Sequence, residues 1–261
     1  MRTPQRERRL PVRNPDRVDS RDIHLLFELG QAQFYRGCEW GQIRRAYDSK
    51  CGGLIVSKRA AVVSQAIIVH PDSPYIHPQD LRDVPVAVNF HAGSHYLTLQ
   101  MLEGFLSRDE IKVVHIPVTA HRYKALLDGT VDAITVAEPW ICLAEKQSCK
   151  LICEAYCVGA EVASTDIDSE IYAAIDRAIK GAVRLINADK KRYLHYLIAD
   201  VPPGMGSLTP EDFHLPRLRY VDPVPYPAEE FKQAYQWMLS WDLIQPDATF
   251  DRIVNNRMAV P

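Results

Sequence analysis

An α/β fold built on a parallel sheet is the architecture that this sequence predicts. The first observation is a strand, helix, strand, helix, strand rhythm between residues 86 and 140, which is typical of parallel strands joined by helices. The second is size: 261 residues, 47% of them hydrophobic, are enough for one large domain or for two small lobes with real cores.

The elements before this stretch are less regular. Residues 1–21 are rich in Arg and Pro and lack periodicity, so we expect a mobile arm there. The apolar run 23–27 fits a buried strand, and residues 31–47 follow a helical pattern. The next segments are read as strands at 54–56 and 60–69, a proline-rich break at 71–78, and a brief turn or helix at 80–83.

The central stretch and the C-terminal part have clearer patterns. The central elements are predicted as a strand at 86–90, a helix at 95–105, a strand at 111–117, a helix from 122 to 129 and a strand at 131–136. Beyond them we expect a helix at 141–148, a strand at 151–163, and helices at 169–187, 190–198 and 228–241. Asp168 is a natural N-cap for the first of these last three helices.

Candidate binding residues follow the strand at 86–90. Gly93 lets backbone approach a ligand closely, and Ser94 is the expected N-cap of the next helix. Free amides at a helix start attract carboxylate, sulfonate or phosphate, so we select His91, Ser94 and His95 as ligand-binding candidates. The turn between the two histidines argues against one helix spanning both, and we expect no metal site.

A second candidate group ends the strand at 131–136. Glu138 and Trp140 flank Pro139 at the carboxyl end of that strand, where ligands bind in parallel sheets. The indole suits stacking and the carboxylate suits hydrogen bonding to an amine or ring nitrogen, while a structural lid over the sheet is the equal alternative. Arg59 and Arg122 are possible anion partners, with solvated charges as the default reading.

The order of these motifs resembles a known family. A strand, then Gly-Ser-His before a helix, then Leu-x-x-Gly-x-Val-Asp-Ala, then Glu-Pro-Trp, is similar to the second lobe of type 2 periplasmic-binding-protein folds. Within them the chain most resembles the substrate-binding proteins of ABC transporters in the nitrate/sulfonate/taurine and thiamine-precursor group. The resemblance covers most of the chain from about residue 22 onward.

The resemblance implies two lobes, each a mainly parallel sheet flanked by helices. Lobe one would combine residues 22–83 with 164–261, and lobe two would be residues 84–163. A small, anionic or aromatic organic ligand would bind between the lobes, with Glu28 as a candidate from lobe one, and an ABC permease would be the partner. The family's first βα unit has no match before residue 23, so we expect it to be absent.

Composition bounds the remaining possibilities. A net charge of −2 gives no reason to expect a nucleic acid partner, and no apolar run reaches the roughly 20 residues that membrane insertion requires. The six cysteines read as free thiols and no secretory signal is visible, so the chain as written is expected in the cytoplasm. A longer N-terminus would instead indicate a periplasmic or lipid-anchored protein.

The alternative function is a cytoplasmic enzyme on the same fold: a desulfinase, a decarboxylase-like enzyme or a thiamine-precursor enzyme. An aromatic sulfinate desulfinase of this fold uses a Cys, a His and an Arg in its first lobe, and His24 with Arg36 loosely resembles that His/Arg pair. The matching Cys would lie in the absent βα unit, and no nucleophile–base set is assembled elsewhere. We therefore expect no catalytic residues and no cofactor.

Overall fold

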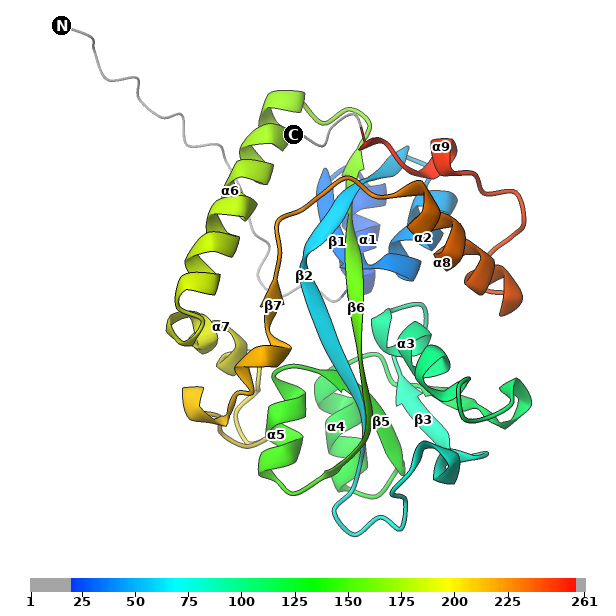
Figure 1. The fold of residues 1–261 in the computed structure, drawn as a ribbon, viewed down its shortest axis with the longest axis vertical. Helices are drawn as coiled ribbons and strands as arrows, with labels where there is room; N and C mark the ends of the chain where they lie inside the picture. Colours follow the sequence, from blue (N-terminus) through cyan, green and yellow to red (C-terminus); the bar gives the residue numbers. More distant parts are fainter. Residues whose placement is uncertain (1–19, 257–261) are drawn as a thin grey trace, which may run out of the picture.

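The computed structural model describes residues 20–256, which form a single mixed sheet covered by helices (Figure 1). The sheet order is β1-β6-β2-β5-β3-β4, and β7 pairs with β2. The strands are β1 (Phe34–Cys38), β2 (Gly53–Val69), β3 (Pro85–Val88), β4 (Lys112–His115), β5 (Ala133–Ala137), β6 (Lys150–Ser164) and β7 (Arg219–Tyr220). The helices are α1 (Ser20–Glu28), α2 (Glu39–Asp48), α3 (Gly93–Leu102), α4 (Thr119–Leu127), α5 (Trp140–Lys146), α6 (Ser169–Ala188), α7 (Leu194–Ile198), α8 (Ala228–Ser240) and α9 (Phe250–Ile253).

The predicted βαβαβ stretch is confirmed: β3, β4 and β5 form a parallel part of the sheet. Strand β3 lies between β4 and β5 and pairs parallel with both of them. Helices α3, α4 and α5 follow β3, β4 and β5 in turn. The carboxyl ends of these three strands point towards one edge of the sheet. The interior of this part is a cluster of buried side chains that includes Ile134, Trp140 and Leu143.

Two long strands join this sheet to the rest of the molecule. Strands β2 and β6 pair antiparallel along most of their lengths and run from the lower half of Figure 1 to the helices α2, α8 and α9 above. Both were predicted as strands. In the upper half β1, β6 and β2 pair antiparallel, so the mainly parallel sheet expected for lobe one was wrong there. The numerical boundaries of the two lobes stay a prediction.

The N-terminal elements differ from the sequence-based expectation. The run expected as a strand at 23–27 lies in helix α1, and the helix expected over 31–47 is strand β1 followed by helix α2. Five apolar residues are too few for periodicity to separate strand from helix. Tertiary packing decides: Phe27 lies edge-on to Tyr35 of β1, with ring centroids 4.7 Å apart. The mobile arm predicted for residues 1–21 falls almost wholly outside the described residues.

The helix over 169–187 was predicted closely. Asp168 is the N-cap of α6, and its carboxylate accepts hydrogen bonds from the amides of Glu170 and Ile171. Such a cap satisfies amides that have no partner within the helix. The helices predicted at 190–198 and 228–241 are also present, the first as a 3-10 turn followed by α7 and the second as α8.

A bulge interrupts the pairing of β2 with β6 near the middle of both strands. Lys58 pairs with Ala160 and Val62 with Val158, so residues 59–61 lie opposite Gly159 alone. A Cβ atom at Gly159 would meet the carbonyl oxygen of Gly37 at 2.1 Å and the Cδ of Arg59 at 2.7 Å. Bulges re-aim side chains, and here the re-aimed residue is Arg59.

Replacing Gly159 with alanine tests this close approach. The added methyl group overlaps backbone that cannot rotate away, so Gly159→Ala is expected to lower the free energy of unfolding by roughly 1–3 kcal/mol or more. Urea unfolding followed by circular dichroism measures it. Gly104→Ala is the matched control, because a Cβ atom there meets nothing within 4 Å. Equal midpoints for the two variants would contradict the packing described here.

Candidate functional site

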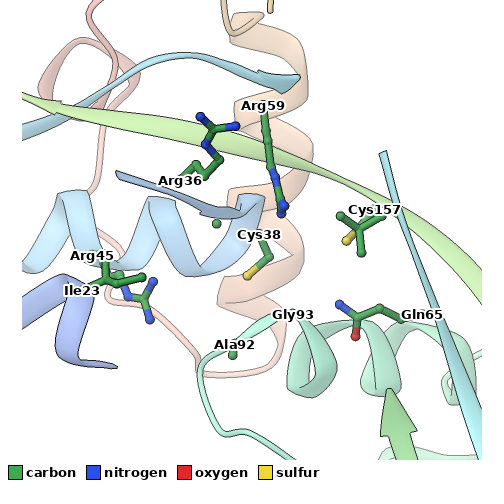
Figure 2. A pocket seen from close by; sticks show the side chains of 11 residues that line it. Ile23, Arg36, Cys38, Arg45, Arg59, Gln65, Ala92, Gly93 and Cys157 are labelled. Atoms are coloured by element: carbon green, nitrogen blue, oxygen red, sulfur yellow. The ribbon is translucent and has the colours of Figure 1, made fainter. Parts of the chain in front are cut away.

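A cavity of about 170 Å³ lies where β1 and α2 meet the beginning of α3 (Figure 2). Its wall therefore combines β1 and α2 with the first turn of α3, a helix from the other half of the molecule. The lining residues are Ile23, Arg36, Gly37, Cys38, Arg45, Arg59, Val63, Gln65, Ala92, Gly93 and Cys157. Three of them carry guanidinium groups, and none of these described lining residues is a carboxylate.

Two glycines bring the walls of the cavity together. A Cβ atom at Gly93 would lie 2.6 Å from Nε2 of Gln65 and 3.3 Å from Cβ of Cys38. A Cβ atom at Gly41 of α2 would lie 2.8 Å from Sγ of Cys38 and 3.2 Å from the carbonyl oxygen of His91. A larger residue at either position would require these neighbouring atoms to move.

Arg59 and Gln65 point into the cavity from the bulged strand β2 (Figure 2). Nε of Arg59 and Oε1 of Gln65 are both buried, and neither has a hydrogen-bond partner among residues 20–256. Gln65 is 8% exposed. Burial, followed by the charge of Arg36, lowers the pKa of Arg59. A buried donor of a cation that lacks an acceptor is costly unless something binds it, which makes Arg59 the central feature of the site.

Two thiols face the same space. Cys38 is the N-cap residue of α2, and Cys157 reaches the cavity from β6. Burial raises the pKa of the Cys38 thiol, and the nearby amide of Gly41 and the charge of Arg45 offset this rise only in part. Burial likewise raises the pKa of Cys157, to about 12. Both sulfurs are therefore protonated at neutral pH and behave as small semi-polar groups rather than as nucleophiles.

The predicted residues His91, Ser94 and His95 lie beside this cavity. His91 precedes α3 with a left-handed backbone (φ 59°), so no helix spans both histidines, as expected. The N-cap assignment of Ser94 was wrong: Ala92 is the N-cap, and the Ser94 hydroxyl instead accepts a hydrogen bond from the amide of Asn89. The ligand-binding role of the three residues stays a prediction, with Ala92 and Gly93 between them in the lining.

The predicted residues Glu28, Glu138 and Trp140 lie outside the cavity lining. Glu28 is the last residue of α1, and its carboxylate accepts a hydrogen bond from the amide of Lys50. Trp140 is 7% exposed and packs against Tyr123 in the core of lobe two. This packing suits a structural residue on the sheet, and the ligand-binding role of Trp140 stays a prediction.

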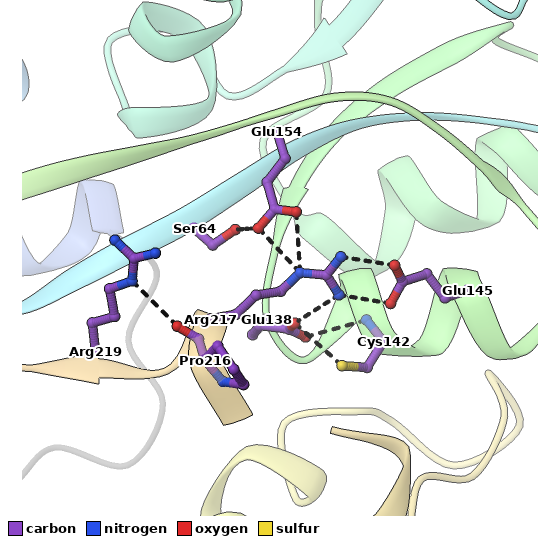
Figure 3. Close-up of polar contacts among 8 residues, drawn as sticks. All are labelled: Ser64, Glu138, Cys142, Glu145, Glu154, Pro216, Arg217 and Arg219. Atoms are coloured by element: carbon purple, nitrogen blue, oxygen red, sulfur yellow. Dashed lines mark hydrogen bonds and ion pairs between the residues drawn. The ribbon is translucent and has the colours of Figure 1, made fainter. Parts of the chain in front are cut away.

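Glu138 belongs instead to an ionic cluster around the buried Arg217 (Figure 3). The Arg217 guanidinium donates to Glu145 of α5 at 2.6 Å and to Glu154 of β6 at 3.0 Å, and lies 3.6 Å from Glu138. Ser64 of β2 donates to the same Glu154 carboxylate at 2.6 Å. The cluster therefore ties a loop before β7 to both crossing strands and to α5. We call these four charged residues the Arg217 cluster.

Sequence reasoning missed part of the cavity lining for identifiable reasons. Of the two arginines considered as anion partners, Arg59 lines the cavity, whereas Arg122 donates to the carbonyl oxygens of Ile116 and Pro117. Gln65 and Cys157 are single polar residues within apolar strands, which carry no motif. A buried polar residue in a strand is the one signal that could have indicated them.

Within residues 20–256, no three His, Cys, Asp or Glu side chains gather closely enough to hold a metal ion. None of the described helices has the length and apolar character required to cross a bilayer.

No protein-family model and no curated protein sequence matches the chain. Solved structures do. The alkanesulfonate-binding protein of Xanthomonas axonopodis pv. citri, bound to MOPS, is 17% identical, with a TM-score of 0.67 over 90% of this chain and 83% of that one. The periplasmic aliphatic sulphonate-binding protein of Escherichia coli is 16% identical, with a TM-score of 0.69 over 90% and 79% of the two chains.

A third solved structure extends the likeness. The ligand-binding component of an ABC-type import system from Staphylococcus aureus, with zinc bound, is 12% identical, with a TM-score of 0.70 over 92% of this chain and 84% of that one. This chain has the type 2 periplasmic-binding-protein fold. The predicted two-lobed fold class is thereby confirmed, and at these identities the likeness establishes the fold alone.

Protonation of His95 is expected to destabilise the protein. His95 is buried, and its Nδ1 accepts a hydrogen bond from the amide of His91. Burial, then the neighbouring His91, lowers its pKa from 6.5 to about 4. The unfolded chain therefore binds more protons between these pH values, so stability is fully present above pH 6.5 and falls by up to about 3 kcal/mol as the pH drops towards 4.

Urea unfolding between pH 4.5 and 7.5 measures this dependence. A His95→Gln variant should lose part of the slope, whereas His121→Gln, which changes an exposed histidine of α4, should retain all of it. Identical slopes for the His95 variant and the parent protein would show that the imidazole is not held in its neutral form.

Removing the arginine of the Arg217 cluster should destabilise the protein strongly. Arg217→Met leaves the buried Glu138 and the partly buried Glu154 without their cation, which is expected to cost roughly 3–5 kcal/mol. Arg219→Met is the control, because Arg219 is exposed and stacks on Tyr156. Thermal unfolding of both variants provides the comparison, and a loss no larger than that of the control would refute the buried-cluster interpretation.

Proposed function

We propose that this chain reversibly binds a small organic anion in the cavity between β1, α2 and the start of α3, as the substrate-binding component of an ABC-type importer. The observation that carries the proposal is the Arg59 guanidinium, which points into the cavity with a buried Nε–H that has no partner among residues 20–256. A ligand oxyanion would supply the missing acceptor. Charge-assisted hydrogen bonds of this kind are about twice as strong as neutral ones.

The remaining wall suits the same ligand. Gly93 and Ser94 form the first turn of α3, where amides have no partner within the helix and the helix dipole is positive. Arg45 adds a second guanidinium from α2, and Gln65 offers an amide that can orient a polar group of the ligand. At about 170 Å³, the cavity is smaller than the roughly 300–1,000 Å³ of drug-sized sites, so a ligand of few heavy atoms fits.

Binding would couple to movement of the lobes. Arg59 and Arg45 belong to the upper elements, and Gly93 belongs to lobe two, so one ligand contacts both sides only when they are close. Strands β2 and β6 are the natural hinges, because they connect the two halves of the sheet. We propose residues 22–83 with 164–261 and residues 84–163 as the two moving units. A ligand that bridges them would favour the closed arrangement.

The importer role is supported by the functions named for the structural neighbours. Two of them are sulfonate-binding proteins, and a third is the ligand-binding component of an ABC-type import system. An ABC permease would then be this chain's partner. The identity of the ligand depends on a few polar side chains rather than on the fold, and those are the cavity residues described above.

An enzyme acting in this cavity would need a nucleophile, and Cys38 is one of the two thiols in the lining. A nucleophilic cysteine requires a lowered pKa or an adjacent base. Burial raises the pKa of Cys38 in spite of Arg45 and Arg59, which favours a thiol that packs against a ligand over one that attacks it. Binding without turnover is therefore the better-supported function.

The test is a binding screen with a matched pair of variants. Isothermal titration with ethanesulfonate, ethyl sulfate, ethyl phosphate and acetate should detect at least one anion, while ethylammonium should not bind. Arg59→Gln should weaken binding at least about tenfold, a loss of about 1.4 kcal/mol. Arg177→Gln removes an exposed arginine of α6 and should leave affinity unchanged.

Analysis of the recovered ligand separates binding from catalysis. An unchanged ligand after overnight incubation, shown by NMR, supports a binding protein, and a consumed one supports the enzyme. If none of the four anions binds detectably, or if the Arg59→Gln variant binds as tightly as the parent protein, an anion site centred on this residue is refuted.

A further inference from the structure

The wall of the cavity offers many hydrogen-bond donors and few acceptors. Its three arginines only donate, its two thiols interact weakly, and all but one of its other side chains have no polar atoms. The exception is Gln65, whose amide has a carbonyl oxygen with two lone pairs. Among the described lining residues, Gln65 is therefore the one side chain that can accept a strong hydrogen bond from a ligand.

This acceptor is unused within the described part of the protein. Gln65 is 8% exposed, and its Oε1 is buried without a hydrogen-bond partner among residues 20–256. The sheet explains why, because the cross-strand neighbours of Gln65 are Ala137 of β5 and Ala155 of β6, whose side chains have no donor. A buried carbonyl oxygen without a donor is unfavourable, so a donor from a bound ligand would stabilise this site.

The Gln65 amide lies beside the first turn of α3 (Figure 2). A Cβ atom at Gly93, the first residue of that helix, would be 2.6 Å from Nε2 of Gln65 and 3.7 Å from its Cδ. The amides of this turn, together with Arg59, are the donors to which the proposed function assigns the acid group of the ligand. A ligand that reaches both the turn and Gln65 must therefore carry its donor within a carbon or two of its acid group.

We propose that the ligand of this cavity is a small acid that also carries a hydroxyl group, and that Gln65 selects it over acids without a hydrogen-bond donor. The inference rests on the proposed function and specifies its substrate class. The hydroxyl donates to Oε1 of Gln65, while the acid group accepts from Arg59 and the start of α3. An ammonium group fits less well, because it adds a charge and none of the described lining residues is a carboxylate that could pair with it.

Two pairs of compounds isolate the contribution of the hydroxyl group. The sulfonates 2-hydroxyethanesulfonate and propane-1-sulfonate share size and charge and differ by a hydroxyl in place of a methyl group, and glycolate and propanoate form the same pair of carboxylates. In each pair that binds, isothermal titration at pH 7 should give a dissociation constant at least about fivefold lower for the hydroxyl compound, because the methyl compound leaves Oε1 of Gln65 unpaired. The ammonium compound 2-aminoethanesulfonate should bind more weakly than 2-hydroxyethanesulfonate.

Variants at position 65 assign this hydroxyl preference to one side chain. Gln65→Met keeps a similar length and removes the acceptor, so the preference should disappear or reverse. Gln233→Met is the matched control, because Gln233 is exposed on α8 and its replacement should leave the preference unchanged. Gln65→Glu introduces a carboxylate and should shift the preference from 2-hydroxyethanesulfonate towards 2-aminoethanesulfonate, a change that a merely structural role of Gln65 would not produce.

The outcomes separate the hydroxy acid from the binding function itself. Equal or tighter binding of the methyl compound in every pair that binds would overturn the hydroxy acid and leave the anion-binding function intact. Tightest binding of 2-aminoethanesulfonate, or an unaltered preference in a folded Gln65→Met variant, would overturn it as well. If that variant does not fold, the comparison of the paired compounds in the parent protein decides. Absence of binding by all of these compounds and by the anions of the earlier screen would overturn the function.

Discussion

The antiparallel pairing of β2 with β6 is the constraint on which the rest of the molecule depends. The two strands extend over Gly53–Val69 and Lys150–Ser164, and they contribute to the cores on both sides of the molecule. Their pairing sets where lobe two attaches, and their bulge at residues 59–61 decides which side chain enters the cavity. In a regular β-ladder, successive side chains alternate between the two faces of the sheet. Arg59 reaches its position because the bulge interrupts this alternation.

The elements of lobe two could be predicted from sequence, because each carries a strong local signal. Strands β3 and β5 are short apolar runs bounded by turns, α3 and α4 have helical spacing, and the βαβ order requires parallel pairing. The region before β2 could not. Its run at 23–27 is apolar in a way that suits either structure, and α1 forms because Phe27 packs on β1, a contact between separate elements.

The candidate site was predicted in part for the same physical reason. A helix start after a glycine is visible in the sequence, so His91, Ser94 and His95 could be selected from it, and Ala92 and Gly93 beside them line the cavity. The Arg59 and Gln65 side chains enter the cavity through a bulge and a crossing strand, which depend on register between residues about a hundred positions apart. Glu138 and Trp140 sit at a strand end as expected, but a loop near Arg217 and a buried core occupy the space around them.

The Arg217 cluster has a consequence for how this chain can evolve. Arg217 forms ion pairs with carboxylates from three separate segments, and the side chain of one of them, Glu138, is only 7% exposed. A lineage that replaced Arg217 alone would pass through an unstable protein. The same holds for a lineage that replaced one of the acids alone, because Arg217 would then lack a partner. Changes at these positions are therefore expected to depend on one another. In distant relatives the four residues are expected to be present together or exchanged together for apolar residues, and a sequence carrying only some of them would need a compensating change nearby.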